Sequence, residues 1–379
     1  MRFVFLSNYF NHHQQPLSDA LASDAQYTFV ATQPMDAERR ALGWAADAGA
    51  PYVCKADGTA EYAALCQADA VIAGSAPEAL VQWAARRGKL IFRYSERPLK
   101  NGNSALKYLP RLLRWYFRNP PWRRTYLLCA SAFTAGDYAK FGLFRHRSYK
   151  WGYFPETRRY PDVGELFAQK RKTTILWCGR FLDWKHPDDV IEIARCLRDD
   201  GRSFRIELAG TGEMEHELKR LTAKYELTEF VHFLGALTPA AVREHMQAAG
   251  IYLFTSDRRE GWGAVLNEAM NSACAVIASD AIGAVPYLVK SGVNGCVYSS
   301  GDTNELYEKL VWLLDNPAAQ ERLGRAAYET ITSLWNAEIA AARLVQLSQS
   351  ILDGCPSPDL FPDGPCSRAE PIYENWYKK

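Results

Sequence analysis

Short apolar runs alternate with amphipathic stretches along most of the chain. In the first half, runs rich in β-branched and aromatic residues, which favour strands, cover 2–8, 27–33, 51–56, 69–75, 89–95 and 125–131. Patterns typical of helices lie between them, near 16–23, 60–67, 77–87, 105–117 and 132–141. This alternation predicts βα units arranged around a parallel sheet.

A less regular stretch, 144–165, interrupts the rhythm before a second series of strand-like runs at 173–179, 204–210, 230–235, 250–256 and 274–280. Two consecutive doubly wound sheets explain this order most simply. We expect an N-terminal Rossmann-like domain over 1–155, a C-terminal Rossmann-like domain over 156–335, and a helix and tail over 336–379 that pack back toward the N-terminal domain. Such sheets bind ligands at the carboxyl ends of their strands, so a cleft between the two domains is expected.

Length and composition agree with this organisation and exclude several classes of protein. The 379 residues suffice for two domains, and 45 Lys and Arg against 43 Asp and Glu give no excess charge that would favour nucleic acid. The nine cysteines include no CxxC pair, which indicates reduced thiols rather than a disulfide framework or a zinc site. No run reaches the roughly 18–20 apolar residues that span a bilayer, and the first apolar run is too short for a signal peptide. We therefore expect a cytoplasmic protein.

The stretch 259–270, REGWGAVLNEAM, has the pattern of a loop that leads from a strand into a helix. A helix that begins near Gly263 would direct its free N–H groups and positive dipole end at a ligand, which suits a phosphate. Glu260 precedes that helix and Glu268 lies within it; eight helical steps would separate them by about 12 Å. This spacing suits two contacts on one elongated ligand, although a loop charge and a solvated helix residue would also produce it.

A second motif, WCGRFLDWKHPDD at 177–189, places Arg180 and Lys185 in a loop after Gly179 at the end of a predicted strand. Two cations at such a position could stabilise a diphosphate, both when it is bound and when it departs. A solvated pair of surface cations is the alternative.

Together these motifs resemble the donor-binding domain of retaining GT-B glycosyltransferases of family 4, also called glycosyl transferases group 1. That family carries a Gly-Arg…Lys motif and a Glu-x7-Glu motif, matched here by Gly179-Arg180…Lys185 and by Glu260…Glu268. The stretches ELAGTGEM (207–214), VHFLGAL (231–237) and 278–298 resemble further landmarks in the same order. This chain departs from the family at 283–286, where Glu is frequent in place of GAVP, and at His186, where Gly is usual.

The resemblance implies an α/β GT-B fold, in which two Rossmann-like doubly wound domains face a central cleft. It also implies a UDP- or GDP-linked sugar donor and transfer of a hexose-type sugar to a hydroxyl with retention of configuration, without a required cofactor or metal. Arg180 and Lys185 would bind the diphosphate, Glu268 the ribose and Glu260 the transferred sugar; Glu260, Arg180 and Lys185 are the catalytic candidates in this domain. The remaining donor-binding candidates are Gly179, Phe233, Leu234, Gly263, Ala264 and Val265.

The first domain offers fewer candidates for the acceptor. His12 and His13 lie in the loop after the first strand; adjacent histidines point different ways in regular structure, which argues against a two-histidine metal site. We expect His12 to contact an acceptor hydroxyl and His13 to lie on the acceptor surface, with two polar residues that cap a helix as the alternative. Glu96 is a further catalytic candidate, and an ion pair with Arg97 or another neighbour is the alternative there.

The stretch 101–124 is basic and aromatic. No acidic residue occurs from Arg97 to Gly136, and Arg111, Arg114 and Arg118 are interleaved with aromatic residues. This pattern is typical of a surface attracted to anionic lipid, so we expect peripheral association with the inner face of the cytoplasmic membrane. An amphipathic helix that packs its aromatics inward is the alternative.

The sequence thus predicts an enzyme that glycosylates a lipid-linked or surface-polysaccharide acceptor. Its partners would be a nucleotide sugar, a glycan or glycolipid acceptor and an anionic membrane surface, with no nucleic acid. Two alternatives remain open: a nucleotide-sugar epimerase of the same fold, and a non-catalytic subunit that binds a nucleotide or a lipid.

Overall fold

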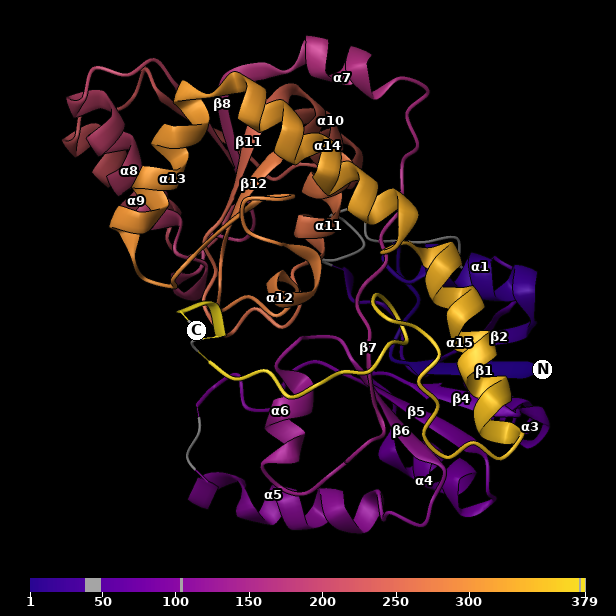
Figure 1. The fold of residues 1–379 in the computed structure, drawn as a ribbon. Coiled ribbons are helices and arrows are strands. Elements are labelled where there is room, and N and C mark those ends of the chain that lie inside the picture. The colour runs from indigo at the N-terminus through magenta and orange to yellow at the C-terminus, as the bar shows by residue number, and fades with distance from the viewer. Residues whose placement is uncertain (38–48, 103–104, 375, 379) are drawn as a thin grey trace. The chain divides into compact units, whose positions relative to one another are not determined.

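The computed structural model describes residues 1–37, 49–102, 105–374 and 376–378. The chain forms two compact units (Figure 1). Unit 1 comprises 1–156 and 334–373, and unit 2 comprises 157–333 and 374–379. Each unit is built on its own parallel sheet.

Unit 1 contains a seven-stranded sheet in the order β3-β2-β1-β4-β5-β6-β7. Its strands are β1 (Arg2–Ser7), β2 (Gln26–Ala31), β3 (Val53–Lys55), β4 (Ala70–Ala73), β5 (Leu90–Ser95), β6 (Thr125–Cys129) and β7 (Ser148–Lys150). Its helices are α1 (Gln15–Asp24), α3 (Ala60–Gln67), α4 (Glu78–Arg86), α5 (Ala105–Arg118), α6 (Thr134–Ala139) and α15 (Ala337–Leu352).

The central strand β1 is buried on both faces, which explains why its sequence is continuously apolar. Val4 and Leu6 belong to the core formed with α3 and α4. Phe5 points to the opposite face, because successive side chains alternate, and its ring lies 5.2 Å from that of Phe29 on β2. Helix α1 packs against both β2 and α15.

The residues after α15 extend the edge of the unit 1 sheet. The backbone N–H of Lys150 on β7 donates to the carbonyl oxygen of Ser367 at 2.8 Å, and Cys366 donates back to Lys150 at 2.9 Å. The chain then returns to unit 2, where the short helix η2 (Trp376–Lys378) is held by a 2.9 Å hydrogen bond from the Trp376 indole to the carbonyl oxygen of Asp280. Unit 1 is therefore completed by residues that follow unit 2 in the sequence.

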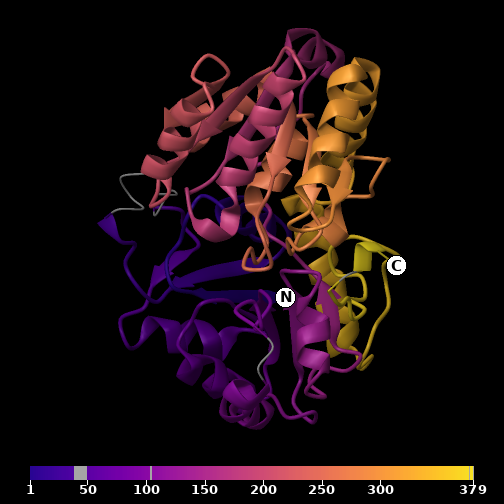
Figure 2. The ribbon, with the colours of Figure 1, turned by 90° about the vertical axis from the view of Figure 1, so that its left-hand side faces the viewer.

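Unit 2 contains a six-stranded parallel sheet in the order β10-β9-β8-β11-β12-β13. Its strands are β8 (Arg171–Cys178), β9 (Arg205–Ala209), β10 (Val231–Gly235), β11 (Ala249–Phe254), β12 (Ala275–Ser279) and β13 (Cys296–Tyr298). Its helices are α7 (Val163–Gln169), η1 (Asp183–Lys185), α8 (Pro187–Asp199), α9 (Glu215–Lys224), α10 (Pro239–Ala248), α11 (Ala264–Asn271), α12 (Val285–Leu288), α13 (Thr303–Asp315) and α14 (Pro317–Ser333). Helices α8, α9 and α13 cover one face of this sheet and α10, α11 and α14 the other (Figure 1); Figure 2 views unit 2 from the side of α8, α9 and α13.

Both sheets confirm the predicted doubly wound α/β architecture. In each, the strand order reverses beside the first strand, between β1 and β4 in unit 1 and between β8 and β11 in unit 2. Ligands of such sheets bind at this switch point, outside the carboxyl ends of the strands. The stretch 144–165, which the sequence left unassigned, contains β7 and the start of α7; a strand of three residues is too short to give a periodic signal.

Candidate functional site

The switch point of unit 2 is formed by the loops after β8 and β11, which are fastened to each other. The Thr255 hydroxyl donates to the carbonyl oxygen of Lys185 at 2.6 Å and accepts from the Trp177 indole at 2.9 Å. The backbone N–H of Asp257 donates to the carbonyl oxygen of Trp184 at 2.9 Å. The loop with the predicted cations therefore has a fixed position against the loop with Glu260.

Lys185 and Glu260 form an ion pair across these loops. The Lys185 ammonium lies 2.5 Å from a carboxylate oxygen of Glu260, and the side chains are only 12% and 13% exposed. Ser256 donates to the same oxygen at 3.1 Å. An ammonium group has three N–H donors, so Lys185 can hold Glu260 and still donate to a phosphate oxygen.

Arg180 differs from the other cations near these loops. Its side chain is exposed and forms no hydrogen bond or ion pair with the described residues. By contrast, Arg259 pairs with both Asp257 and Asp183, at 3.1 and 3.2 Å. A guanidinium without a protein partner, beside the strand ends, is free to pair with an anionic ligand.

Two glycines allow the loops after β8 and β9 to lie against each other. A Cβ atom on Gly210 would meet the carbonyl oxygen of Gly179 at 1.9 Å, and one on Gly212 would meet the carbonyl oxygen of Phe181 at 2.6 Å. The close approach is fixed by backbone hydrogen bonds, from Gly179 to Ala209 at 3.0 Å and from Phe181 to Thr211 at 2.9 Å. The stretch ELAGTGEM thus supports the loop that carries Arg180.

Helix α11 begins as the sequence predicts, directly after Gly263. This glycine has φ +87°, a conformation that other residues rarely adopt, and a Cβ atom there would lie 2.4 Å from the Phe254 ring. The buried Trp262 supports the turn through a 2.9 Å hydrogen bond from its indole to Asn267. The N–H groups of the first turn, including those of Ala264 and Val265, have no partner within the helix, so they can bind an anion.

Glu268 acts electrostatically on two groups that the sequence did not single out, Cys178 and Tyr252. Burial and the nearby charge of Glu268 raise the pKa of the Cys178 thiol to about 12, against an opposing effect of Lys185. Burial also raises the pKa of Tyr252, and the charges of Cys178, Glu268 and Glu260 add to this shift. Tyr252 and Cys178 are therefore close enough to Glu268 to feel its charge; because both lie within apolar strands, no sequence signal marks them.

Phe233 and Leu234 lie at the end of β10, where the register with β9 shifts. The Phe233 ring packs edge-on against Phe181, with 6.1 Å between the ring centroids. This contact links β10 to the Arg180 loop. The contact of Phe233 and Leu234 with a nucleotide base stays a prediction.

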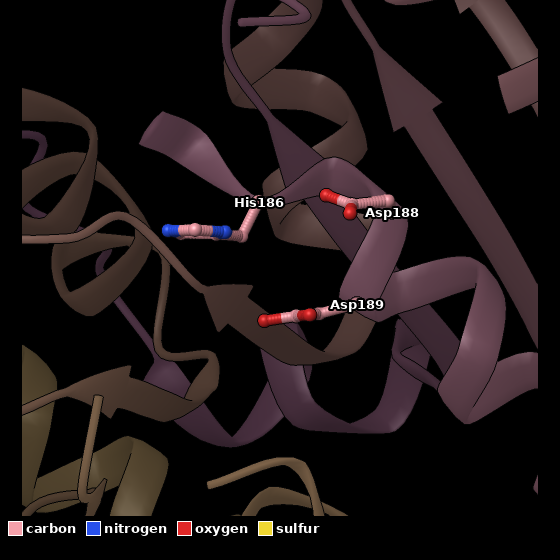
Figure 3. Close-up of side chains that lie close together, drawn as sticks. All are labelled: His186, Asp188 and Asp189. Carbon is pink, nitrogen blue, oxygen red and sulfur yellow. The ribbon is translucent and has the colours of Figure 1, made fainter. Parts of the chain in front are cut away.

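His186 follows Lys185 directly and lies beside several carboxylates. Figure 3 shows its ring with the side chains of Asp188 and Asp189 at the start of α8. One atom from each of these residues lies within 4.8 Å of the others, the only such group of three potential metal ligands in the described ranges. The His186 ring also pairs with Asp257, with 3.7 Å between Nε2 and Oδ2.

Unit 1 has a cavity of about 440 Å³ at its own switch point. The cavity is lined from the ends of β1, β4 and β5, by residues that include Ser7, Ser75 and Glu96, and by the aromatic side chains of Trp115 and Tyr153. Polar groups and aromatic rings in one concave site suit a sugar.

Glu96 is oriented within this cavity by two neighbours. The Tyr153 hydroxyl donates to one carboxylate oxygen at 2.8 Å, and Lys100 lies 3.2 Å from the other. Arg97, the partner suggested by the sequence, instead pairs with Asp137 at 3.4 Å in the interior.

His12 and His13 do not line the cavity. Their rings lie side by side, with centroids 3.9 Å apart, because residues 11–14 form a turn. The expectation that the two rings diverge is therefore wrong. Burial, together with the charge of His12, lowers the pKa of His13 to about 3, so this ring is neutral and a weak base at physiological pH.

Helix α5 and the segment that follows it, up to Trp122, present apolar side chains to solvent. Phe117 and Trp122 are 75% and 78% exposed, and Leu113 and Tyr116 are about half exposed. Arg114 is exposed as well, whereas Arg118 lies 3.9 Å from Glu78; the side chain of Arg111 lies outside the described residues. Within the part of the chain that the structure describes, no helix combines the length and apolar character needed to cross a bilayer.

The two doubly wound units and the site at the β8–β11 switch point define a GT-B protein. HepE from Anabaena in complex with UDP superposes with a TM-score of 0.67 over 93% of this chain and 98% of its own, at 16% identity. Sucrose-phosphate synthase from Thermosynechococcus elongatus superposes with a TM-score of 0.66 over 94% and 100%, at 15% identity. At such identities the likeness establishes the fold alone.

Residues 162–330 match the family model of glycosyl transferases group 1, the family that the motifs of this segment resemble. The curated relatives include the amylovoran biosynthesis glycosyltransferase AmsK of Erwinia amylovora, 26% identical over 47% of this chain and 44% of its own length. They also include a phosphatidyl-myo-inositol mannosyltransferase of Mycobacterium leprae, 26% identical over 52% of this chain and 50% of its own. The chain thus spans about half the length of the curated relatives it matches.

Proposed function

We propose that this protein is a retaining glycosyltransferase that moves a hexose-type sugar from a nucleotide sugar to a hydroxyl of a glycan or glycolipid. The observation that carries the proposal is the cationic site at the switch point of unit 2. There, Lys185, Arg180 and the N-terminus of α11 converge at the ends of β8 and β11. The family model that matches residues 162–330 supports the same class of reaction, and so do the names of two relatives, an amylovoran biosynthesis glycosyltransferase and a phosphatidyl-myo-inositol mannosyltransferase.

In the proposed reaction, the acceptor oxygen forms a bond to the anomeric carbon while the bond from that carbon to the diphosphate breaks. The nucleoside diphosphate leaves with the bonding electron pair, and the acceptor hydroxyl loses its proton. Negative charge accumulates on the departing phosphate, where Arg180, Lys185 and the first N–H groups of α11 stabilise it. Glu260 holds Lys185 in place and contacts the sugar, and Glu268 binds the ribose.

We place the acceptor sugar in the cavity of unit 1. The Glu96 carboxylate, oriented by Tyr153 and Lys100, can accept a hydrogen bond from an acceptor hydroxyl. Trp115 and Tyr153 supply aromatic surface for a sugar ring. Glu96 is the principal candidate in this unit because it lines the cavity, which His12 and His13 do not; the contact of His12 with an acceptor hydroxyl stays a prediction.

Incubation with a panel of UDP- and GDP-linked sugars tests the proposal. A transferase releases the nucleoside diphosphate only as sugar is transferred or hydrolysed, and the anomeric configuration of the product reports retention or inversion. An epimerase would convert the donor sugar without releasing nucleotide, and a non-catalytic subunit would bind donor without turnover. Either result would overturn the proposal.

A second experiment tests the proposed acceptor site in unit 1. Glu96→Gln should lower turnover to acceptor while leaving the slow hydrolysis of the donor unchanged, because Glu96 belongs to a different unit from the donor site. Equal losses of transfer and hydrolysis would contradict the assignment.

We also propose that α5 attaches the protein to an anionic membrane. Phe117 and Trp122 would insert at the interface while Arg114 pairs with lipid phosphates. Flotation with vesicles containing phosphatidylglycerol should fail for Phe117→Ser/Trp122→Ser and persist for a matched pair of exposed apolar residues on unit 2, Val293→Ser/Trp312→Ser. Equal flotation of both double variants would refute this attachment.

A further inference from the structure

The last part of the chain docks on unit 2 beside the donor site. Having completed the edge of the unit 1 sheet, the chain returns to unit 2, where we call the described residues 374 and 376–378 the terminal segment. Glu374 contacts the loop after β11, Trp376 the loop after β12, and Tyr377 the first turn of α13, after β13. Because β11, β12 and β13 are parallel, these three points lie at one edge of the sheet, the edge at which ligands of such sheets bind.

The first contact is an ion pair with the loop that carries Glu260. A carboxylate oxygen of Glu374 lies 2.9 Å from the guanidinium of Arg258, two residues before Glu260. The side chains of Arg258 and Glu374 are 29% and 45% exposed, so the pair alone changes an affinity by no more than about fivefold. A second contact is therefore needed to fix this loop firmly.

The second contact reaches Glu260 by a different route. The Trp376 indole donates to the carbonyl oxygen of Asp280, at 2.9 Å, in the loop after β12. That loop is itself held in place, because the buried carboxylate of Asp280 accepts a hydrogen bond from the backbone N–H of Ser300 at 2.8 Å. Within the same loop, the backbone N–H of Gly283 donates to the carbonyl oxygen of Glu260 at 3.2 Å. Trp376 and Glu260 are therefore connected through one short loop.

Tyr377 anchors the far end of the terminal segment. Its hydroxyl donates to a carboxylate oxygen of Glu305 at 3.3 Å, and the ammonium of Lys309 lies 5.9 Å from the centre of its ring. Glu305 also pairs with Lys309 at 3.2 Å and accepts a 2.8 Å hydrogen bond from the backbone N–H of Ser299. The terminal segment therefore ends on a helix start that is already fixed by its own contacts, and it can hold the two loops against that support.

We infer that Glu374 and Trp376 are positioning residues: by two routes they hold the backbone around Glu260 and thereby keep its carboxylate against Lys185 for the binding of a nucleotide-sugar donor. This inference rests on the proposed function of unit 2 as a donor site. Neither residue has to touch the donor, because Glu374 acts through its ion pair and Trp376 through the loop after β12. Donor affinity thus depends on a segment that the family motifs do not include.

Calorimetric titration with UDP-glucose and with GDP-mannose, under conditions in which every protein is fully folded, tests the inference. One variant ends the chain after Tyr373, and two single substitutions, Glu374→Gln and Trp376→Phe, leave the backbone of the segment in place. Arg258→Glu is compared with the charge exchange Arg258→Glu/Glu374→Arg. The control is Asp363→Asn, which removes an ion pair of similar exposure from the part of the C-terminal chain that packs on unit 1.

We expect loss of the segment to weaken donor binding about tenfold, and each single substitution to weaken it about threefold, because each removes one of the two routes. The charge exchange should bind the donor about threefold more tightly than Arg258→Glu alone, since only the exchange restores opposite charges at the two positions. Asp363→Asn should bind as the wild type does. Should the shortened chain fail to fold, the single substitutions and the charge exchange make the same comparison.

Hydrogen exchange measures the positioning without a donor. In each weakened variant the amides of 256–263 and 280–285 should exchange faster, whereas those of β9 should not change. Unchanged exchange in both loops, or donor affinity equal to that of the wild type in Glu374→Gln and Trp376→Phe, would overturn the inference and leave the donor site intact. No binding of either donor to the wild type would overturn the proposed function, and the inference with it.

Discussion

Separating the structural role of the Lys185–Glu260 pair from its role in binding offers the most direct test of the donor site. The perturbations are Lys185→Met, which keeps most of the side-chain volume, Glu260→Gln, and both together. With one partner gone, the other is left as a largely buried group without its counter-charge. With both gone, no charge remains to be compensated.

The magnitudes follow from the geometry. Two unit charges about 3 Å apart attract by roughly 5 kcal/mol at an effective dielectric constant of about 20, and desolvation offsets much of that gain. Each single variant should therefore lose about 1–3 kcal/mol of unfolding free energy, and the double variant should lie within about 1 kcal/mol of the wild type. The coupling energy between the two sites would be about 3 kcal/mol.

Donor binding should respond differently. Lys185→Met removes a charged donor to the diphosphate, which is worth about 1.5–3 kcal/mol, or roughly 10- to 150-fold in affinity. The double variant should recover stability without recovering affinity. If Glu260 only holds Lys185 and does not contact the donor, Glu260→Gln should bind the donor as tightly as the wild type. The two proteins are compared under conditions in which both are fully folded.

Scanning calorimetry and titration of the best nucleotide sugar measure the two quantities separately. Arg220→Met is the control, because Arg220 also pairs with a glutamate, at 2.6 Å, but its side chain is 54% exposed; the substitution should change neither property measurably. Recovery of affinity together with stability in the double variant would refute the assignment of Lys185 to the diphosphate.

Three further substitutions test residues that position the loops and strands around the donor site. Gly210→Ala should lower the free energy of unfolding by about 3 kcal/mol or more, because its Cβ would overlap the Gly179 carbonyl oxygen. Gly201→Ala, where φ is +66° and the surrounding space is open, should lower it by only about 1 kcal/mol. Equal losses in thermal unfolding would contradict the close packing of the loops. Gly263→Ala should weaken donor binding about tenfold or more by displacing the start of α11 from the Phe254 ring, and unchanged affinity by calorimetric titration would remove that helix end from the phosphate site. Lys170→Met should destabilise unit 2 by about 2–4 kcal/mol, because the buried ammonium donates to the carbonyl oxygens of Met246, Gln247 and Ala249. A smaller loss in urea unfolding would mean that water takes the place of the ammonium as the donor to these oxygens.

The sequence predicted the sheets and the start of α11 because these features depend on local patterns. Alternating apolar runs identify buried parallel strands, and Gly263 before a run of helix formers identifies where a helix begins. The shared family motifs then indicated which strand ends carry the site.

Such patterns could not predict contacts between residues that are distant in the sequence. Lys185 and Glu260 are 75 positions apart, and nothing in either segment shows that they form one ion pair rather than two separate ligand contacts. The same holds for Glu96, whose partners are Lys100 and Tyr153 rather than the adjacent Arg97. The expectation that the rings of His12 and His13 diverge was wrong for another reason: it assumed regular structure where the chain forms a turn.

The return of the chain to unit 1 after unit 2 has a consequence for synthesis on the ribosome. Helix α1 packs against α15, and β7 gains its outer hydrogen bonds from residues 366 and 367, so unit 1 lacks these partners until more than 180 residues beyond its sheet have been translated. The six strands of unit 2, in contrast, lie on one continuous stretch of chain. The second half of this protein is therefore expected to reach its native fold before the first, which reverses the usual order from the N-terminus to the C-terminus.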